Sequence, residues 1–570
     1  MSSIIGQWSI IDYIHQGPWY KNRGILTLNF FLLIPLMTSV VNGLDSSLIN
    51  GLQISPDWQE YFNHPKGKTL GLLNSAQFVG NLSGLPFSPF ISDIYGRRAS
   101  LFFGGLIMCV GVALQAAAWN IPMFIGARYT IGFGLSFCQN ASPLLLIELA
   151  YPTQRGRITA MFNTCWYFGS IISAWVCFGT FNHASGSQWS WRVPTLVQAL
   201  CPLVQIIAVW FMPESPRWLI SKGMESKAAA ILAKYHACGS DEHDPLVMFE
   251  MAQIRHAIRI EEEINRTTSY WSLFSHSGNR KRMRIIMGIA VFSQWSGNGL
   301  VSYYINLILE GVGITSTDQK AIINGCLQIF NFGIAIGSAM VVDIAGRRPL
   351  FLVSNSGMLI TFCIWTITNA LYNALGNVAA AKATIPLIFF FFFFYDLAYT
   401  PLLIAYALEI LPFKVRAKGF AVMVGAFTST LHSVGNLVLY QNLTMMATIA
   451  FNQFVNPWAL AAIDWWYYVV YCGWLVVELV FIFFFVVETK GRTLEETAAL
   501  FDGDDHPRDL MAMGGEAATM TMRLSRHLTL PDKDTEQRAE DKTDEYYQMK
   551  RRYRDSDITD SSADLQPRAI

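Results

Sequence analysis

The chain has 570 residues, of which 52% are hydrophobic, 14% are charged and 14% are aromatic, and its formal net charge is zero. A soluble chain normally carries about 25% charged residues, so this composition excludes an ordinary soluble protein and indicates one that lies in a lipid bilayer. Without a net positive charge, no global basic field suggests a nucleic-acid partner.

Apolar runs long enough to cross a membrane recur along the whole chain. A spanning helix needs about 20 mostly apolar residues, and that length predicts twelve spans. They lie near 25–51, 69–92, 99–118, 121–147, 157–181, 192–212, 285–309, 320–342, 349–371, 384–410, somewhere in 420–462, and 465–487. We therefore expect an all-α membrane protein with two bundles of six helices.

The spans divide the chain into five segments. They are a cytoplasmic N-terminus at 1–23, a six-helix bundle at 24–212, a cytoplasmic helical linker at 213–284, a second six-helix bundle at 285–487, and a tail at 488–570. In the linker, Glu225–Tyr235 and Met248–Ile264 alternate charged and apolar residues at helical spacing, which predicts short amphipathic helices under the bundles. The polar tail should be disordered after about residue 503.

Lysine and arginine in the short loops predict the orientation, because these residues stay on the cytoplasmic side. One set of loops carries Lys21, Arg23, Arg97, Arg98, Arg155, Arg157, Arg347, Arg348, Lys414, Arg416 and Lys418. The opposite loops carry little beyond Lys66, Lys68, Lys320 and Lys382. We therefore expect both termini and the linker in the cytoplasm.

Three charged junctions occur twice, in the same order and on the same predicted side. Asp93–Arg98 returns as Asp343–Arg348, Glu148–Arg155 as Glu409–Arg416, and Pro213–Trp218 is followed after the twelfth span by Glu488–Arg492. Such a repeat indicates two related halves. Duplicated six-helix halves are typical of a transporter whose binding site lies between them near the membrane midplane.

The charges at these junctions are candidates for a cytoplasmic gate. They are Asp93, Arg97, Glu148, Arg155, Glu214, Arg217, Asp343, Arg347, Glu409 and Arg416. Ion pairs between helix ends would hold the inner side shut in one state and separate in the other, and a few kcal/mol per pair would suffice to bias the two states. The alternative is that they only determine the topology.

One stretch does not fit the repeat. Between Arg416 and Trp465 there is room for one span by comparison with the fifth span, and Val424–Gln441 is surplus. One hypothesis is an insertion from an unspliced intron. The stretch begins with a valine codon and ends with a glutamine codon, and these codons can supply the GT and AG splice signals. The other is a genuine extended or re-entrant element.

Over about 24–500 the chain resembles the sugar porter family of the major facilitator superfamily. The residues that carry the resemblance are Gly80, Gly84, Pro89, Asp93, Gly96, Arg97, Arg98, Arg128, Gly132, Gly134, Glu148, Pro152, Arg155, Gly156, Trp191, Arg192, the run Pro213–Leu219, and Asp343, Gly346, Arg347 and Arg348. The stretches Asn42–Gln53, Phe451–Pro457 and Glu488–Glu495 are similar to the fungal branch that includes lactose permease and related hexose or oligosaccharide carriers. The resemblance implies the major facilitator fold and sugar transport.

The seventh predicted span carries a polar stripe. Gln294, Asn298 and Ser302 are spaced four residues apart, and Tyr303 and Tyr304 follow. A sugar site needs amides and hydroxyls for the sugar hydroxyls and aromatic faces for the C–H side of the ring, and a polar stripe within a span rarely faces lipid. The alternative is that each amide only joins helices.

The resemblance implies further sugar contacts and also departures from the family pattern. Gln294 matches the second of the family's paired glutamines in this span, and Asn331 matches its asparagine contact in the eighth. The departures are Ser293 for the first glutamine, Gly299 for the asparagine with Asn298 beside it, Asn163 for a glutamine in the fifth span, and Ile404 for the tryptophan of the tenth span, with Tyr406 as its substitute. These changes put a glucose preference in doubt and favour a longer sugar.

Asp45 lies in the middle of the first span, where an ionised carboxylate needs a cationic partner or a bound proton. Arg128 begins a face of the fourth span that continues through Ser136 and Asn140. In related proton-coupled sugar porters the matching pair makes a proton-dependent contact, so the resemblance implies that a proton on Asp45 frees the halves to move. The alternative is a static ion pair, as in some facilitators.

Together these features predict a twelve-helix alternating-access transporter for a neutral sugar at the plasma membrane, driven by protons and acting as a monomer. The alternatives are a facilitator or polyol carrier, and a non-transporting sugar sensor that signals through its tail. No nucleophile triad, metal cluster or phosphate-binding glycine loop suggests an enzyme, and no cofactor is expected besides the proton.

Overall fold

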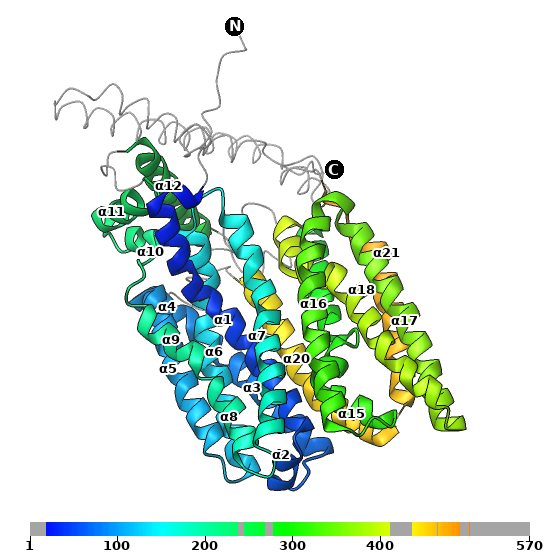
Figure 1. The fold of residues 1–570 in the computed structure, drawn as a ribbon. Coiled ribbons are helices and arrows are strands. Elements are labelled where there is room, and N and C mark those ends of the chain that lie inside the picture. The colour runs from blue at the N-terminus through cyan, green and yellow to red at the C-terminus, as the bar shows by residue number, and fades with distance from the viewer. Residues whose placement is uncertain are drawn as a thin grey trace, which may run out of the picture.

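The computed structural model describes residues 19–237, 244–267, 277–410, 436–463, 465–490 and 501. Within these ranges every regular element is a helix. The long helices of the two halves lie side by side, and the helices α10 to α12 lie at one end of the bundle (Figure 1). We call this the linker end.

The first half of the chain supplies the first six predicted spans. They are α1 (Arg23–Ile54), α3 (Gly67–Gly84) continued by α4 (Ser88–Tyr95), α5 (Arg97–Ala116), α6 (Ile121–Leu149), α7 (Arg155–His183), and α8 (Trp189–Val197) continued by α9 (Leu200–Ala208). The short helices η2 (Trp19–Lys21) and α2 (Pro56–Tyr61) flank α1.

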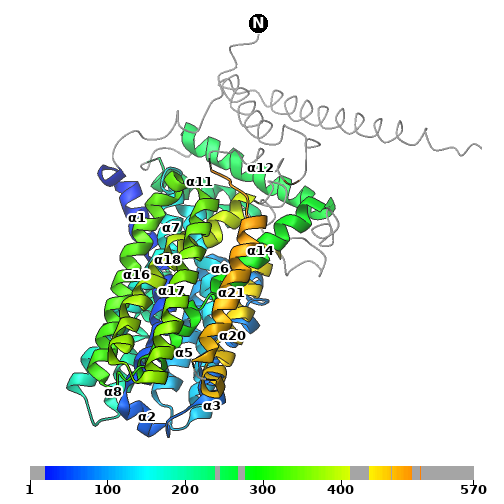
Figure 2. The same ribbon diagram turned by 90° about the vertical axis from the view of Figure 1, so that its right-hand side faces the viewer.

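The linker and the second half follow. The linker forms α10 (Pro216–Ser221), α11 (Glu225–Tyr235) and α12 (Pro245–Thr267), and α12 lies across the end of the bundle (Figure 2). The second half forms α14 (Ser277–Trp295), α15 (Asn298–Gly311), α16 (Thr317–Ala345), α17 (Arg347–Leu375), α18 (Val378–Ile410), α20 (Asn436–Ile463) and α21 (Trp466–Phe485). Each of the twelve predicted spans thus corresponds to one helix or to a broken pair.

Among the described residues, eight of these spans are long and apolar enough to cross a membrane, one of them being α8 together with α9. The other four predicted spans are α3 with α4, α7, α14 with α15, and α20. All four pack across the boundary between the halves, in the contacts of α3 with α20, α7 with α16, and α15 with α1. Helices that line an internal surface carry polar residues and therefore have a lower hydropathy than helices that face lipid.

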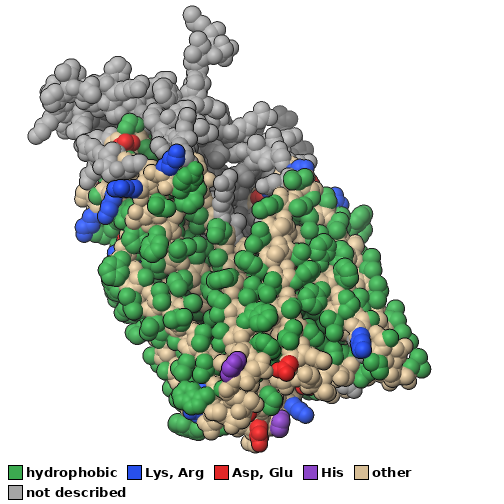
Figure 3. All heavy atoms as spheres, viewed as in Figure 1, with side chains coloured by type: hydrophobic (Ala, Val, Ile, Leu, Met, Phe, Trp, Pro, Cys, Tyr) green, Lys and Arg blue, Asp and Glu red, His purple; other side chains and the backbone are tan. Residues whose placement is uncertain are grey.

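The surface pattern agrees with a bilayer around the bundle. Hydrophobic side chains dominate the flank seen in Figure 3, and charged side chains gather toward its two ends. Large apolar residues such as Phe30, Ile360 and Phe484 are exposed on different helices, which would be costly in water and is favourable in lipid.

The seventh span is broken, which the hydropathy of the sequence did not indicate. α14 ends at Trp295 and α15 begins at Asn298, with Gly297 between them at φ +105°. Tyr304 also has a non-helical backbone, at φ −136° and ψ 25°. Gln294, Asn298 and Ser302 therefore do not form a stripe on one continuous helix, and that expectation is corrected.

The proposed insertion lies mostly outside the described residues. Positions 424–435 are not described, whereas 436–441 form the first turns of α20. Arg416 and the tail after 490, apart from Phe501, are also outside the described residues.

Candidate functional site

The repeated junction forms a network of charges at the linker end of the first half. The Arg97 guanidinium contacts Asp93 Oδ1 at 3.4 Å and donates from Nε to Glu148 Oε2 at 3.3 Å. Glu214 contacts the main chain instead, because its carboxylate accepts the backbone N–H groups of Arg97 and Arg98 at 3.3 and 3.2 Å. These groups are the free donors at the start of α5, so Glu214 caps that helix.

The second half repeats this network. Arg347 donates to both carboxylate oxygens of Glu409, at 2.8 and 3.1 Å. Glu488 accepts the backbone N–H groups of Arg347 and Arg348, each at 3.0 Å. The side chain of Asp343 is outside the described residues. The two halves thus share an ion pair and a helix cap at their repeated junctions.

A glycine in each turn makes the cap possible. Gly96 has φ +99° and ψ 165°, and Gly346 has φ +89° and ψ 164°. This backbone region is open essentially to glycine alone. A Cβ atom would also lie 2.6 Å from Glu214 Oε2 at Gly96 and 2.9 Å from Glu488 Oε2 at Gly346.

The two capping acids differ in their protonation. Burial raises the pKa of Glu214, although backbone donors from Ser215 and Arg98 oppose the shift. Glu488 is less buried, and the backbone N–H groups of Arg347, Lys490, Arg348 and Thr489 outweigh the effect of burial and lower its pKa. Similar geometry therefore leaves Glu488 the more firmly ionised of the two.

The gate stays a prediction, and its ion pairs lie within the halves. Among the described residues, each ion pair of the network joins helices of the same half and none connects the two halves. Arg155 donates to the carbonyl of Ala150 at 3.1 Å and contacts Glu250 of the linker at 4.0 Å. Arg217 lies in α10, close enough to Arg155 for their charges to interact.

The predicted pair of Asp45 and Arg128 meets inside the first half. Both side chains are fully buried, and Arg128 Nη1 lies 3.8 Å from Asp45 Oδ1. Two residues that the sequence reasoning missed complete the group. Gln198 donates to Asp45 Oδ1, and Gln77 accepts from Arg128 Nη2 at 2.6 Å. Asp45 Oδ2 has no hydrogen-bond partner among the described residues.

Two predicted sugar contacts, Gln294 and Asn298, lie at the break between α14 and α15. The carbonyl of Gln294 accepts from Asn452 at 2.7 Å, and its side chain donates to Ser293 Oγ at 3.2 Å. Asn298 opens α15, and Asn331 lies in α16. Both asparagines are buried, and their Oδ1 atoms have no partner among the described residues. A hydroxyl donor would satisfy either one.

Three tyrosines and Asn163 were also predicted contacts. The Tyr303 ring meets Phe78 of the first half edge-on, and Tyr304 donates its hydroxyl to the carbonyl of Gln453 at 2.5 Å. Asn163 is half-buried in α7. Tyr406 does not join this group, and that prediction is corrected.

Tyr406 lies instead at the linker end of the second half. Its hydroxyl donates to the carbonyl of Val487 at 2.8 Å and accepts the Val487 N–H at 3.0 Å. Its ring packs on Phe351. The spacing along the tenth span was misleading because Tyr406 is only three residues before Glu409, at the charged end of α18.

Most hydrogen bonds between the halves lie at the end opposite the linker. Asn50 of α1 donates to the carbonyl of Ser302, Gln53 to that of Tyr303 at 3.3 Å, and Asn306 of α15 to that of Gln53 at 3.1 Å. Tyr167, near the middle of α7, also donates across the boundary, to Asp396 of α18. The structure therefore holds the halves together on the side away from the linker.

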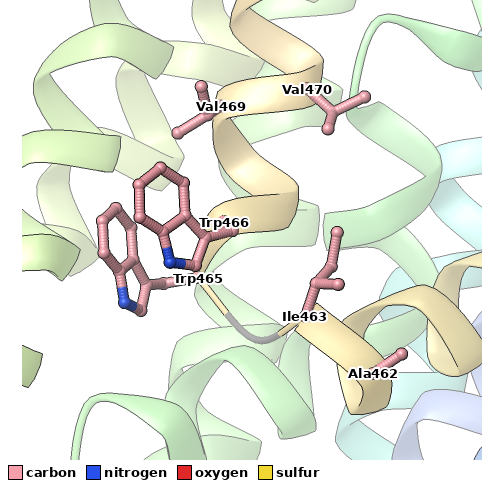
Figure 4. Close-up of a pocket in the computed structure, with 6 residues that line it drawn as sticks. All are labelled: Ala462, Ile463, Trp465, Trp466, Val469 and Val470. Atoms are coloured by element: carbon pink, nitrogen blue, oxygen red, sulfur yellow. The ribbon is translucent and has the colours of Figure 1, made fainter.

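A separate cavity lies at the junction of α20 and α21 (Figure 4). It is lined by Ala462, Ile463, Trp465, Trp466, Val469 and Val470, and the two tryptophan rings stack with centroids 4.5 Å apart. It contains none of the predicted sugar-binding residues, and its lining lacks the amides and hydroxyls that a sugar needs.

Comparisons with known proteins bear on this arrangement. The family described as "Sugar (and other) transporter" matches residues 31–501. The high-affinity glucose transporter of Kluyveromyces lactis is 25% identical over 514 residues, which cover 86% of this chain and 88% of that protein. Hexose transporter 2 of the same yeast is 28% identical over 505 residues, which cover 85% and 84%.

Solved structures show the same fold. The inward open conformation of the xylose transporter XylE from E. coli matches with a TM-score of 0.66 and 20% identity, covering 83% of this chain and 100% of that one. The proton:xylose symporter XylE bound to 6-bromo-6-deoxy-D-glucose matches with a TM-score of 0.64 and 21% identity, covering 84% and 100%. This similarity confirms the two-bundle fold that the sequence predicted.

Proposed function

The chain belongs to the sugar (and other) transporter family, and we propose that it carries a neutral hexose or disaccharide across the plasma membrane together with protons. It acts as a monomer, with both termini, the linker at 213–284 and the tail at 488–570 in the cytoplasm. Two features support this proposal, the buried pair of Asp45 and Arg128 and the buried amide oxygens of Asn298 and Asn331 that have no partner among the described residues.

The pair of Asp45 and Arg128 carries the proton-coupled part of the proposal. An ionised Asp45 attracts Arg128, which also holds Gln77 of α3. A proton on the free Oδ2 atom would remove this attraction, because a neutral acid no longer compensates a buried arginine. α1 would then be free to shift, and Asn50, five residues further along α1, holds the second half through Ser302.

The substrate part rests on hydrogen-bonding capacity. Asn298 and Asn331 have buried oxygens without partners, and Gln294 lies beside the break that separates α14 from α15. Leaving such groups unpaired costs about 1–3 kcal/mol each. Sugar hydroxyls would offset that cost and tie the second half to the substrate, so that substrate binding favours the movement of the halves.

A facilitator or polyol carrier is the second candidate, because relatives of the chain are named simply as glucose and hexose transporters. It would use the same amides without moving protons. A sugar sensor is a third candidate, and it would depend on the tail. Sugar uptake that survives deletion of 503–570 would exclude a role as sensor alone.

Uptake of labelled glucose, lactose and cellobiose by a transporter-null yeast tests the proposal. We expect one of these sugars to accumulate, and a protonophore to abolish the accumulation. Uptake that only equilibrates and ignores the protonophore would support the facilitator. No uptake of any of the three sugars at normal surface expression would contradict the proposed substrate class.

A further inference from the structure

A second carboxylate lies between the two halves. Asp396 is fully buried in the middle of α18. Tyr167 of α7, in the other half, donates its hydroxyl to Asp396 Oδ1 at 2.5 Å, and Thr400 donates to the same oxygen at 2.6 Å. One carboxyl oxygen thus receives two hydroxyl donors, and one of these hydrogen bonds crosses between the halves.

The charge of this carboxylate has no partner. Asp396 forms no ion pair among the described residues, and its Oδ2 atom has no hydrogen-bond partner there. The titratable groups around it are Tyr167, Tyr395 beside it on α18, and, beyond Tyr395, Tyr303 of α15 and Glu478 of α21. None of them is a cation. A carboxylate buried without a cation costs several kcal/mol, whereas a protonated acid is neutral.

From this geometry we infer that Asp396 is a second proton-binding site of the transport cycle, distinct from Asp45. The inference rests on the proposed proton coupling. Asp45 has Arg128 beside it and can stay ionised, whereas Asp396 has only hydroxyl donors. The proton binds to the free Oδ2 atom, and Oδ1 keeps the hydrogen bonds from Tyr167 and Thr400.

The position of Asp396 connects this proton to the movement of the halves. A hydrogen bond to an ionised carboxylate is roughly twice as strong as one to a neutral acid. Loss of the proton therefore tightens the contact between Tyr167 and Asp396, and protonation loosens it. One of the two states of the halves then binds the proton better than the other, which is the condition for coupling.

The site also lies next to the predicted sugar contacts. Asn163 precedes Tyr167 by one helical turn on α7, so their side chains share a face. Tyr395 donates its hydroxyl to the carbonyl of Ser293 at 2.7 Å, and Ser293 precedes Gln294. Proton and sugar therefore bind to adjoining parts of the boundary between the halves.

Two proton sites predict two protons per sugar, which a reversal measurement can test. The full chain is reconstituted in vesicles that hold a fixed gradient of labelled glucose, lactose or cellobiose, whichever the uptake screen selects. The pH gradient at which the net flux of sugar stops then gives the number of protons transported per sugar. We expect two protons per sugar for the native chain and one for Asp396→Asn, which keeps the shape and the Oδ1 acceptor. Tyr167→Phe, which leaves the acid in place, should keep a ratio of two.

An unchanged ratio in Asp396→Asn, or a ratio of one in the native chain, would overturn the inference and leave the proposed symport intact. A native ratio of zero would refute the symport itself, and the second proton site with it. For a variant that does not transport, infrared difference spectra between acid and neutral pH can still show whether a carboxylic acid binds a proton. The C=O band of a protonated carboxylic acid should be weaker in Asp396→Asn than in the native chain and retained in Asp396→Glu, and equal bands in all three would also overturn the inference.

Discussion

Glu488 contacts Arg347 through the main chain and not through the guanidinium. Its carboxylate accepts the Arg347 backbone N–H at 3.0 Å, while the Arg347 side chain donates to Glu409. One arginine therefore connects two acids, one that caps the start of α17 and one on α18. Because negative charge is favourable at a helix N-terminus, the cap and the ion pair support each other.

Alanine at Gly346 should destabilise the protein more than alanine at Gly376. Gly376 has φ +63° and nothing within 4 Å of a built Cβ atom, so Gly376→Ala should cost about 1–2 kcal/mol of backbone strain. Gly346→Ala adds a contact of 2.9 Å with Glu488 in a backbone region that only glycine enters readily. The midpoint of thermal unfolding in detergent should fall further for Gly346→Ala, and equal shifts would contradict this account of the cap.

The capping acids should give opposite pH dependences. The pKa of Glu488 is lowered in the folded state, so its contribution to stability is present above the ordinary glutamate pKa and is lost as the pH falls through the lower folded pKa. The pKa of Glu214 is raised, so the folded state binds this proton more tightly and stability declines as the pH rises from the unfolded pKa to the folded one.

Thermal unfolding of the two glutamine variants across acidic pH tests this difference. Glu488→Gln should lose most stability relative to the native chain near neutral pH and least in acid. Glu214→Gln should remove the decline on the alkaline side of the ordinary glutamate pKa. If stability depends on pH in the same way in both variants, the two capping acids titrate alike.

Asp45→Asn should abolish accumulation of sugar against a gradient but leave exchange of labelled for unlabelled sugar. Asparagine keeps an acceptor for Gln198 but cannot carry the proton. Efflux, exchange and accumulation in vesicles would separate these properties. Accumulation that survives the substitution would remove Asp45 from the coupling.

Gln294→Ala should weaken sugar binding without loss of surface protein. One lost hydrogen bond is worth about 0.5–1.5 kcal/mol, which corresponds to a KM raised by roughly 2–13-fold. Tyr406→Phe is a matched control, because it removes one hydroxyl whose partner is Val487 at the linker end. We expect it to lower the unfolding temperature and leave the KM unchanged, whereas an unchanged KM in Gln294→Ala would place Gln294 outside the site.

The twelve spans could be predicted from the sequence because length and apolar character decide which segments enter a bilayer. The break at Gly297 could not, because hydropathy averages over a window and is blind to one residue with a positive φ. Arg97 and Glu148 could be picked out for a different reason. Each lies in a charged junction that the second half repeats, at Arg347 and at Glu409.

The partners within the site were harder to predict. Asp45 and Arg128 were named through the resemblance, but Gln77 and Gln198 were missed although a polar residue inside a span is itself a signal. Asp396 carried the same signal, as an acid in an otherwise apolar run. Tyr406 was assigned to the sugar site by its place in a motif, and only the fold reveals that this turn of α18 lies beside Val487.

The confinement of each charge network to its own half has a thermodynamic consequence. If the halves turn as rigid bodies, Arg97 and Arg347 do not have to leave their carboxylates during a transport cycle, and the large desolvation energies of those ions cancel between the two states. What changes from state to state is a small set of contacts between the halves, the amide contacts of Asn50, Gln53 and Asn306 and the hydrogen bond from Tyr167 to Asp396. So few hydrogen bonds add little to the energy barrier between the two states. Thermal fluctuation therefore suffices to return the empty carrier to its starting state.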